Sequence, residues 1–332
     1  MAQQTASIAR PLQTIPVDAA AFFRIAHPYR IAPRLGIALS DRSYLPRTDD
    51  LEADWVATVA APAFARLRQA RGAERCRRFC ALGTGSGMDA LAAIEFLGAD
   101  VVGLTDLFPD VVDAAAANVA GNLRPDTNVR IHSGAGDLLE PLRHSGVRFD
   151  IIYENLPNLP LADDARLEHS QTSSGFVPPR PEPVPKLFQD NLLALHTVAL
   201  KQARDYLAPG GAVLSTLGGR VPLSVITAMA THAGLTPDIF TYTWKAQVDA
   251  DAMLTSYAAW QQRGLGPFHF YLVEDLRRAF DKIDPVEAGQ RAEDIEHLLA
   301  PKRLDAVAAL AAHRTGARIG HTVAVLKSEL PQ

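Results

Sequence analysis

Residues 81–91 read ALGTGSGMDAL and lead from a short apolar run, through three glycines, into the start of a helix. Glycines permit positive φ angles and let a ligand approach the main chain, while the free amides of the first helical turn face that ligand. Gly83, Gly85 and Gly87 are spaced as GxGxG, because a dinucleotide fingerprint would require glycine where methionine follows Gly87. Asp106 ends the next apolar run, where a carboxylate can accept hydrogen bonds from both hydroxyls of a ribose. The pattern favours a nucleoside ligand over an ordinary tight turn.

Around this turn, short apolar runs alternate with amphipathic segments. This order predicts parallel crossover units, because parallel neighbours need a connection long enough to cross the sheet. We therefore expect an α/β fold with a Rossmann-like, doubly wound, mostly parallel sheet of seven strands. The predicted strands lie at 77–83, 99–106, 128–134, 149–155, 212–219, 238–248 and 320–330.

The same patterns predict a division of the chain. Residues 1–50 are rich in proline without clear periodicity, which indicates an irregular or partly helical N-terminal cap. The ligand-binding domain is expected at 51–248. Its first segment has the apolar spacing of a helix, although Pro62 within it is unfavourable for helix formation. We expect a helical insertion or lid at 249–319, and at 320–332 a last strand that returns to the sheet. The proline-rich residues 176–186 are expected to form an extended loop.

Composition narrows the classes of function. The 332 residues include 33 Lys and Arg against 37 Asp and Glu, and a net charge of -4 disfavours a nucleic acid partner. An arginine run could make a local exception (Arg66, Arg68, Arg71, Arg75, Arg77 and Arg78). Two cysteines form neither a disulfide framework nor a four-ligand zinc site, so we expect no metal and a reducing compartment. We expect a cytoplasmic, soluble protein with a small-molecule substrate, and a homodimer is compatible with the sequence.

Several segments together resemble the class I S-adenosylmethionine (SAM)-dependent methyltransferases. In chain order they are SYLPRTDDL at 43–51, LGTGSG at 82–87 followed by Asp106, GDLLEPL at 136–142, and FDIIYENLPNLP at 149–160. Their pattern is most similar to the branch that includes the glutamine methyltransferases of release factors and the related small-domain RNA methylases. The resemblance covers roughly residues 43–235.

The resemblance implies SAM as the cofactor and assigns roles to the matching residues. Asp106 would hold the ribose hydroxyls, and Asp137 would meet the adenine amino group, although Asp137 could instead cap a helix. Arg47 would lie near the methionine end of SAM, or be only a surface charge. Glycine-turn residues would line the methionine and ribose portions, and two leucines would sandwich the adenine ring (Gly83, Thr84, Gly85 and Gly87; Leu107 and Leu138).

One element departs from the family pattern. In the relatives an Asn-Pro-Pro-Tyr element positions a planar target nitrogen beside the sulfonium methyl, with the tyrosine stacked on it. Here the element is Asn155-Leu156-Pro157-Asn158, so Asn155 is kept and Asn158 replaces the aromatic residue. The change favours a smaller or non-planar acceptor, held by Asn158 or by aromatics from elsewhere; alternatively, both asparagines only cap a loop.

Two further candidates flank this element. Tyr153 and Glu154 precede Asn155, and Glu154 could hold a substrate ammonium, accept its proton, or be merely solvated. Aromatic residues gather in and near the insertion, where they could wall a substrate pocket or form a small core (Trp244, Tyr257, Trp260, Phe268, His269 and Tyr271).

The expected function is methyl transfer to a small-molecule acceptor, such as an amine, an amino acid or a natural-product intermediate, by direct displacement at the sulfonium methyl. A first alternative breaks a different bond of SAM: its 3-amino-3-carboxypropyl group is transferred, or closes on itself to azetidine-2-carboxylate, and methylthioadenosine is released. A second alternative is a protein or RNA methyltransferase. A SAM-binding scaffold without catalysis is the last alternative.

Overall fold

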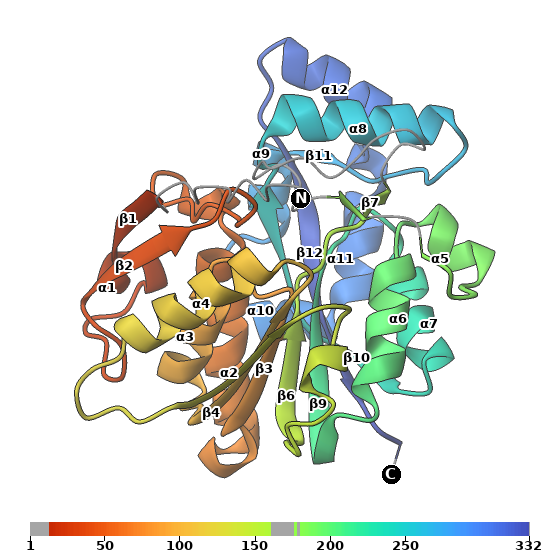
Figure 1. Cartoon of the computed structure of the whole chain (residues 1–332). Coiled ribbons are helices and arrows are strands. Elements are labelled where there is room, and N and C mark those ends of the chain that lie inside the picture. The colour runs from red at the N-terminus through yellow and green to blue at the C-terminus, as the bar shows by residue number, and fades with distance from the viewer. Residues whose placement is uncertain (1–12, 161–175, 178–179, 332) are drawn as a thin grey trace, which may run out of the picture.

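The computed structural model describes residues 13–160, 176–177 and 180–331. Their centre is a twisted sheet whose main path follows the strand order β10-β12-β9-β6-β3-β4-β5 (Figure 1). All neighbours on this path are parallel except β12, which is antiparallel to both β9 and β10. The strands are β3 (Arg78–Leu82), β4 (Val101–Asp106), β5 (Arg130–Ala135), β6 (Phe149–Glu154), β9 (Leu207–Gly218), β10 (Thr236–Ala246) and β12 (Ile319–Glu329).

The predicted mostly parallel α/β sheet is therefore confirmed, with one addition. A two-residue strand, β11 (Tyr271–Leu272), pairs with the start of β12 and makes the sheet eight-stranded. A strand this short inside the insertion carries no periodic signal. The last strand, β12, lies between β9 and β10. The insertion therefore connects two strands, β10 and β12, that are direct neighbours in the sheet.

Strand order creates one special position in the sheet. After β3 the chain adds β4 and β5 on one side, and then crosses to place β6 on the other side of β3. All six residues of β6 are buried, as expected for a central strand that helices cover on both faces. Ligands of open parallel sheets bind beyond the carboxyl ends of the strands where the order reverses, here between β3 and β6.

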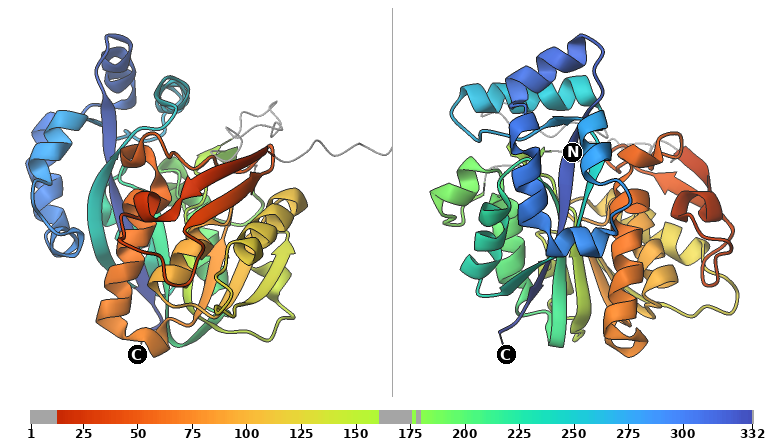
Figure 2. Two further views of the ribbon diagram at one scale, coloured as in Figure 1. Left: turned by 90° about the vertical axis from the view of Figure 1, so that its left-hand side faces the viewer. Right: turned by 180° about the vertical axis from the view of Figure 1, so that it is seen from behind.

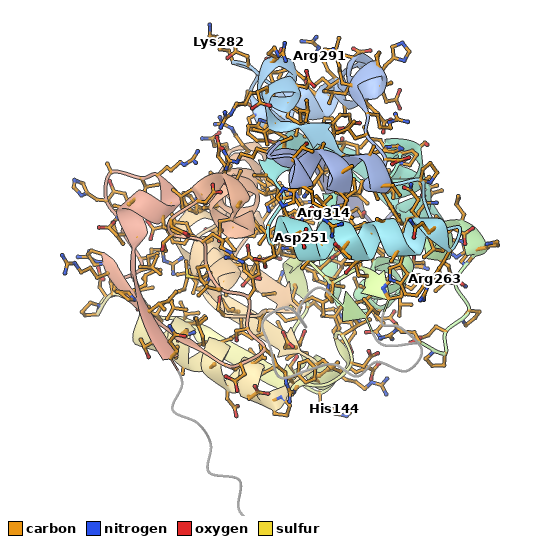
Figure 3. All side chains as sticks on the ribbon, turned by 90° about the horizontal axis from the view of Figure 1, so that it is seen from above. His144, Asp251, Arg263, Lys282, Arg291 and Arg314 are labelled. Atoms are coloured by element: carbon orange, nitrogen blue, oxygen red, sulfur yellow. The ribbon has the colours of Figure 1, made fainter. Side chains whose placement is uncertain are left out.

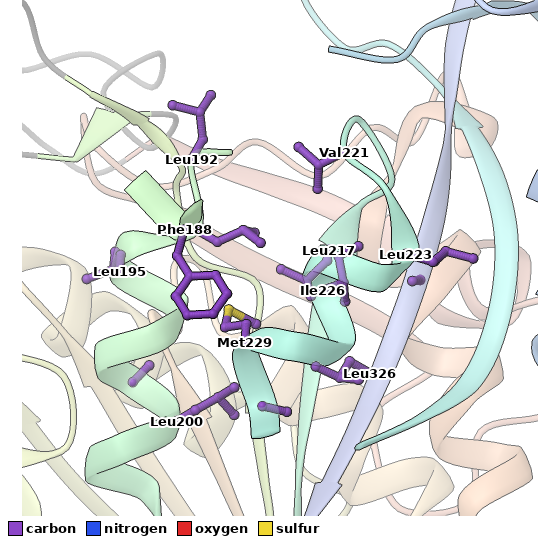
Figure 4. Packing of buried hydrophobic residues seen from close by; sticks show 14 of the residues in the cluster. Phe188, Leu192, Leu195, Leu200, Leu217, Val221, Leu223, Ile226, Met229 and Leu326 are labelled. Carbon is purple, nitrogen blue, oxygen red and sulfur yellow. The ribbon is translucent and has the colours of Figure 1, made fainter. Parts of the chain in front are cut away.

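Helices cover both faces of the sheet (Figure 2). One layer consists of α2 (Ala61–Arg71), α3 (Met88–Phe96) and α4 (Pro109–Gly121). The other includes α5 (Lys186–Asp190), α6 (Ala194–Ala203) and α7 (Leu223–His232). In that layer Phe188, Leu200 and Met229 meet Leu217 of β9 and Leu326 of β12 in one apolar core (Figure 4). Burial of this apolar surface holds the helices on the sheet.

The N-terminal cap is more regular than predicted. It forms an antiparallel pair, β1 (Gln13–Asp18) and β2 (Arg34–Leu39), connected through the short helix α1 (Ala19–Phe23). The side chains of Asn118 and Asn122 on α4 each accept a hydrogen bond from the outer edge of β2 and donate one back to it. The helix α1 agrees with a partly helical cap, but the strand pair was not predicted, because β2 buries only three alternating side chains.

The segment expected as one helix from Leu51 is divided. It consists of a 3-10 turn (Leu51–Ala53), a π-helical turn (Val56–Ala60) and α2. Asp54 interrupts it, since its carboxylate accepts hydrogen bonds from the amides of Val56 and Ala57 at 2.8 Å each. Pro62 lies in the first turn of α2, where a missing N–H is tolerated.

The predicted extended loop at 176–186 lies partly outside the described residues. Within them, β8 (Phe176–Val177) pairs with β7 (Leu159–Pro160), and residues 180–185 have no regular secondary structure before α5 begins. The Pro-Gly-Gly sequence at 209–211, which precedes the strand predicted at 212–219, lies inside β9. The pairing of β9 with β6 shifts register between Phe149 and Ile151 to accommodate it.

The insertion is helical, as expected, and has two parts. Helices α8 (Ala250–Gln262) and α12 (Ala306–Arg314) lie side by side beyond the carboxyl end of the sheet, joined by an ion pair of 3.2 Å between Asp251 and Arg314 (Figures 1 and 3). Helices α9 (Val273–Ala279), α10 (Pro285–Gln290) and α11 (Ala292–Leu299) form the second part, in which α10 packs on β10. None of the helices in the described ranges is long and apolar enough to cross a membrane.

Candidate functional site

A cavity of about 320 Å³ lies at the carboxyl ends of β3, β4, β6 and β9, where the strand order reverses. Its floor consists of the glycine turn, the ends of β4 and β9, and the segment after β6. Residues from 42 to 56 close one side, and residues of the insertion close another. The structure therefore brings together segments that are spread between residues 42 and 268 of the sequence.

The glycine turn has the backbone that its sequence predicts. Gly83, Gly85 and Gly87 have φ angles of +70°, +52° and +80°, a region that other residues rarely adopt. The amides of Gly83 and Thr84 both donate to the carbonyl of Thr105 at 2.9 Å, which holds the turn on β4. A Cβ on Gly85 would meet nothing within 4 Å, so its cavity face is open main chain.

Gly87 differs from the other two glycines. It precedes α3 as its N-cap, does not line the cavity, and a Cβ there would lie 3.1 Å from the carbonyl oxygen of Ala115 on α4. Gly87 therefore packs against α4 instead of facing the cavity. Gly83 is also closely packed, since a Cβ there would lie 2.9 Å from Leu156.

Asp106 is partly committed to the glycine turn. Its carboxylate accepts hydrogen bonds from the amides of Gly85 at 3.2 Å and Phe108 at 3.4 Å, and burial raises its pKa. A carboxylate has about four acceptor positions, so two remain for a ligand's hydroxyls. Beside it, the side chain of Leu107 is 47% exposed, while Leu138 lines the same part of the cavity and is buried. An exposed leucine at a cavity mouth is surface that a flat apolar ring would cover.

Asp137, the predicted adenine contact, lines the cavity but is already paired. Arg180 donates to both of its oxygens, at 2.7 and 3.1 Å, and thereby lowers the pKa of Asp137. Gln202 donates to the same carboxylate at 3.3 Å. The alternative that Asp137 caps a helix is not observed, since the nearest turn begins after Leu139.

The segment after β6 faces the cavity with both asparagines. The hydroxyl of Tyr257 on α8 donates to Oδ1 of Asn158 at 3.0 Å. Asn155 lines the cavity, and its side chain makes no hydrogen bond to any described residue. Leu156 lies between them against the glycine turn. Asn158 thus does more than cap a loop, and Asn155 keeps its amide available for a ligand.

Glu154 is not placed as predicted. Its side chain is fully buried, does not line the cavity, and accepts hydrogen bonds from Nδ1 of His196 at 2.8 and 3.0 Å. Direct contact with a substrate is therefore excluded in this arrangement, because β6 directs the side chain toward α6. His196 itself lines the cavity, and its Nε2 has no partner among the described residues.

The sequence reasoning missed His196. It occurs in the apolar helix ALHTVALKQA, where a lone histidine is easily interpreted as core. The signal that could have found it is Glu154, a fully buried carboxylate at a strand end, which requires a donor.

Tyr153 and Arg47 have supporting positions. Tyr153 is buried, with ring centroids 5.1 Å from Phe64 and 6.4 Å from Phe79, so it forms part of the floor from the core side. Arg47 lines the cavity and pairs with both oxygens of Asp249 at 2.8 and 2.9 Å. Arg47 is therefore not an isolated surface charge, because it connects the segment before α2 to the start of the insertion.

The aromatic residues of the insertion divide between the two predicted roles. Tyr257 and Phe268 line the cavity, and their rings meet edge to face at 5.0 Å. The other members do not line it (Trp244, Trp260, His269 and Tyr271). Lining residues that the sequence analysis did not single out include Arg42, Trp55, Arg180, Arg220 and Gln247.

No protein-family model and no curated protein matches the sequence. Among solved structures, the chain is similar to a ribosomal protein L11 methylase from Lactobacillus delbrueckii subsp. bulgaricus (20% identity, TM-score 0.35, 53% of this chain and 69% of that chain). It is also similar to a methyltransferase from Pyrococcus furiosus (19%, 0.31, 48% and 65%). A third is a SAM-dependent methyltransferase from Agrobacterium tumefaciens (15%, 0.37, 64% and 62%). Because every TM-score is below 0.5, the function proposed below rests on the residues of the site.

Proposed function

We propose that the protein is a SAM-dependent transferase that methylates a small-molecule acceptor. The observation that carries the proposal is the hydrogen bond from the Gly85 amide to the carboxylate of Asp106. The main chain at Gly85 is open to the cavity, and the carboxylate keeps acceptor positions free. Such a pair suits the ribose of a nucleoside, and the exposed Leu107 beside it suits the base.

The residues present fit SAM. Gly83, Thr84 and Gly85 would face its amino acid and ribose, and Asp106 would accept from the ribose hydroxyls. Oγ1 of Thr84 is buried and has no hydrogen-bond partner in the described structure, as expected for a hydroxyl whose partner is a bound ligand. The adenine would lie between Leu107 and Leu138, with Asp137 and its partner Arg180 at the amino edge.

SAM, when bound, supplies a methyl group on a sulfonium, a leaving group already activated. The chain has to hold the acceptor in line, exclude water and remove a proton. Asn155 and Asn158 present amide groups at the end of β6 and would orient the acceptor. Nε2 of His196 would receive the acceptor's proton while Glu154 holds Nδ1–H and stabilises the charged ring.

Two features support a small acceptor. Residues between 42 and 56 close the cavity on one side and the insertion closes it on another. The ion pair of Arg47 with Asp249 joins these two sides. The arginine run that could have bound RNA is largely neutralised, since four of its members pair with carboxylates (Arg66 with Asp284, Arg71 with Glu329, Arg77 with Asp100, Arg78 with Asp150). Paired arginines contribute little to phosphate binding.

A second candidate uses the same cofactor. Transfer or cyclisation of the 3-amino-3-carboxypropyl group needs no planar acceptor, and the position where the family holds an aromatic platform is Asn158, whose amide binds Tyr257. This observation favours the alternative over a nucleobase or peptide amide as the target.

Product analysis separates these functions. The purified protein is incubated with SAM and amino acids, amines, extract metabolites, RNA or protein, and the nucleoside is identified by mass spectrometry. S-adenosylhomocysteine (SAH) that depends on a small acceptor supports methyl transfer, and methylthioadenosine supports the second candidate. SAH formed only with RNA or protein contradicts the small-molecule assignment. If every mixture leaves SAM unchanged, the proposed enzyme class is rejected.

A further inference from the structure

Arg220 is a buried cation in the wall of the cavity. It follows β9, its residue surface is 6% exposed, and it lines the cavity together with Gln247, Tyr257 and Trp55. Gly218 makes room for it, because a Cβ on that glycine would collide with Nη1 of Arg220. The guanidinium is therefore built into the site, and is not a surface side chain that happens to fold inward.

The hydrogen-bond partners of Arg220 are neutral. Its Nη2 donates to Oε1 of Gln247 at 2.9 Å and to Nε2 of His321 at 2.8 Å. His321 can accept this bond because its Nδ1 donates to the carbonyl of Thr322 at 2.8 Å. Burial and the nearby cations Arg220 and Lys245 lower the pKa of His321 well below its usual value, which keeps the ring uncharged.

No carboxylate among the described residues lies within ion-pair distance of Arg220. The buried acid on this side is Asp54, and backbone amides of Arg47, Val56 and Ala57 already bind its carboxylate. Lys245 lies 4.4 Å from the Trp55 ring centroid, and burial and then the charge of Arg220 lower its pKa well below the usual value. Arg220 is therefore a buried guanidinium without a carboxylate partner in the described part of the chain.

Two groups contact the guanidinium without neutralising it. The Tyr257 ring centroid lies 5.0 Å from the guanidinium carbon and the Phe270 ring centroid 6.0 Å. Nε of Arg220 is buried and has no hydrogen-bond partner in the described structure. A buried charge without a counter-ion destabilises the folded protein, so an arrangement that keeps one is typical of a site that receives an anion.

We infer that Arg220 binds a carboxylate of the acceptor molecule, and that the acceptor is a carboxylic acid with an apolar body. This inference rests on the proposed function, because it assumes that a second molecule enters the cavity beside SAM. The carboxylate would accept from the guanidinium N–H groups that Gln247 and His321 leave unpaired on the cavity side. The apolar body follows from the neighbouring walls, which are mainly hydrocarbon (Trp55, Leu217, Val221, Met253, Tyr257 and Phe268).

The test compares an acid with its neutral isostere. Calorimetry measures binding of 3-phenylpropionate and 3-phenylpropionamide to the full-length protein saturated with SAH. The wild type should bind the acid at least about tenfold more tightly than the amide, the range for a hydrogen bond to a charged group. Arg220→Met should remove this preference and leave the affinity for SAH within about twofold. Arg220→Lys, which keeps the charge but not the fork, should retain a weaker preference.

A matched control is Arg263→Met. Arg263 also lies over an aromatic ring, 4.9 Å from the centroid of Trp260, but it does not line the cavity (Figure 3). This variant should bind both probes as the wild type does. Circular dichroism checks the fold of each variant; if Arg220→Met is unfolded, the acid and amide affinities of the wild type and of Arg220→Lys decide.

Two results overturn the inference. In the first, the wild type binds the acid no more tightly than the amide, or binds neither. In the second, Arg220→Met weakens SAM and SAH but not methylthioadenosine, which lacks the amino acid portion, so that Arg220 holds the carboxylate of the cofactor. If SAH does not bind the wild type at all, the proposed function fails instead, and the same acid and amide titrations without SAH still test the anion site.

Discussion

The hydroxyl of Tyr257 donates a hydrogen bond to Oδ1 of Asn158 across 99 residues of sequence. Tyr257 belongs to α8 of the insertion, and Asn158 belongs to the segment that follows the central strand β6. The bond leaves the amide nitrogen of Asn158 as a donor toward the cavity and brings the ring of Tyr257 to the segment that follows β6. The insertion is thus part of the site.

We predict that Tyr257→Phe separates acceptor positioning from cofactor binding. Loss of one hydrogen bond should lower the free energy of unfolding by about 1 kcal/mol. Without this bond the side chain of Asn158 can rotate and no longer holds the acceptor in line with the methyl group. This should lower kcat/KM for the acceptor roughly tenfold. SAH affinity, measured by calorimetry, should not change. The control is Tyr271→Phe, a buried tyrosine of the insertion outside the cavity lining, which should keep full activity. Equal losses in both variants would mean that Tyr257 has only a structural role.

His196 and Glu154 should act as one unit in proton removal. His196→Ala should lower kcat roughly 10²- to 10⁴-fold, the contribution of a general base. Glu154→Gln should lower it less, because the ring keeps a hydrogen-bond partner but loses the negative charge beside it. The loss should appear in kcat, because His196 is expected to act on the acceptor's proton and not on binding of the cofactor.

Calorimetry on both variants completes the test. SAH affinity should be unchanged in His196→Ala and in Glu154→Gln, because the pair is expected to act on the acceptor and not on the cofactor. His232→Gln, at an exposed position of α7, serves as the control. Wild-type kcat in His196→Ala would show that the pair only supports the fold.

Asp106 should be required for the nucleoside. Asp106→Asn removes two acceptor positions and should weaken SAH binding by roughly 1.5–3 kcal/mol, the cost of losing hydrogen bonds to a charged group. SAM and methylthioadenosine share the ribose, so calorimetry should show similar losses for both. Asp113→Asn on the exposed face of α4 should bind all three as the wild type does. A loss for SAM alone would place Asp106 at the sulfonium end instead.

Asp89 should make the unfolding free energy depend on pH. Burial raises the pKa of Asp89 to about 7, whereas the same group titrates near 4 in an unfolded chain. Between these values the folded state holds a proton that the unfolded state has lost, so stability falls as pH rises toward 7 and is constant above it. Asp89→Asn should therefore be more stable than the wild type at pH 8, by a margin on the order of 4 kcal/mol.

Urea unfolding of both proteins from pH 4 to 8 checks this prediction. The difference between the two curves isolates Asp89, because the other titrating groups are common to both. The margin should shrink steadily toward pH 4. A difference independent of pH would show that the Asp89 carboxyl ionises normally in the folded protein.

Much of the fold was predictable from local patterns. Apolar runs spaced by amphipathic helices predict the parallel sheet, and the glycines at 83 and 85 predict a left-handed turn, since both signals depend on neighbours in sequence. Where the local signal is short, as in the three buried residues of β2, the prediction failed. In that strand, the deciding contacts come from Asn118 of α4 and from Asn122, which follows α4, at separations of 80 and 86 residues.

The polar residues at strand ends also follow from the sequence, because the carboxyl ends of parallel strands meet at one edge of a sheet. Asp106 and Asn155 reach the cavity for that reason. The pairs that give the site its chemistry do not follow, since they join elements far apart in the chain: His196 with Glu154 over 42 residues, and Arg220 with His321 over 101. Which of these side chains face each other depends on the order of the strands and on how the helices pack on the sheet. Local periodicity thus determines the fold class, whereas the assembly of the layers decides that His196 is the proposed base and that Arg220 lacks a carboxylate partner.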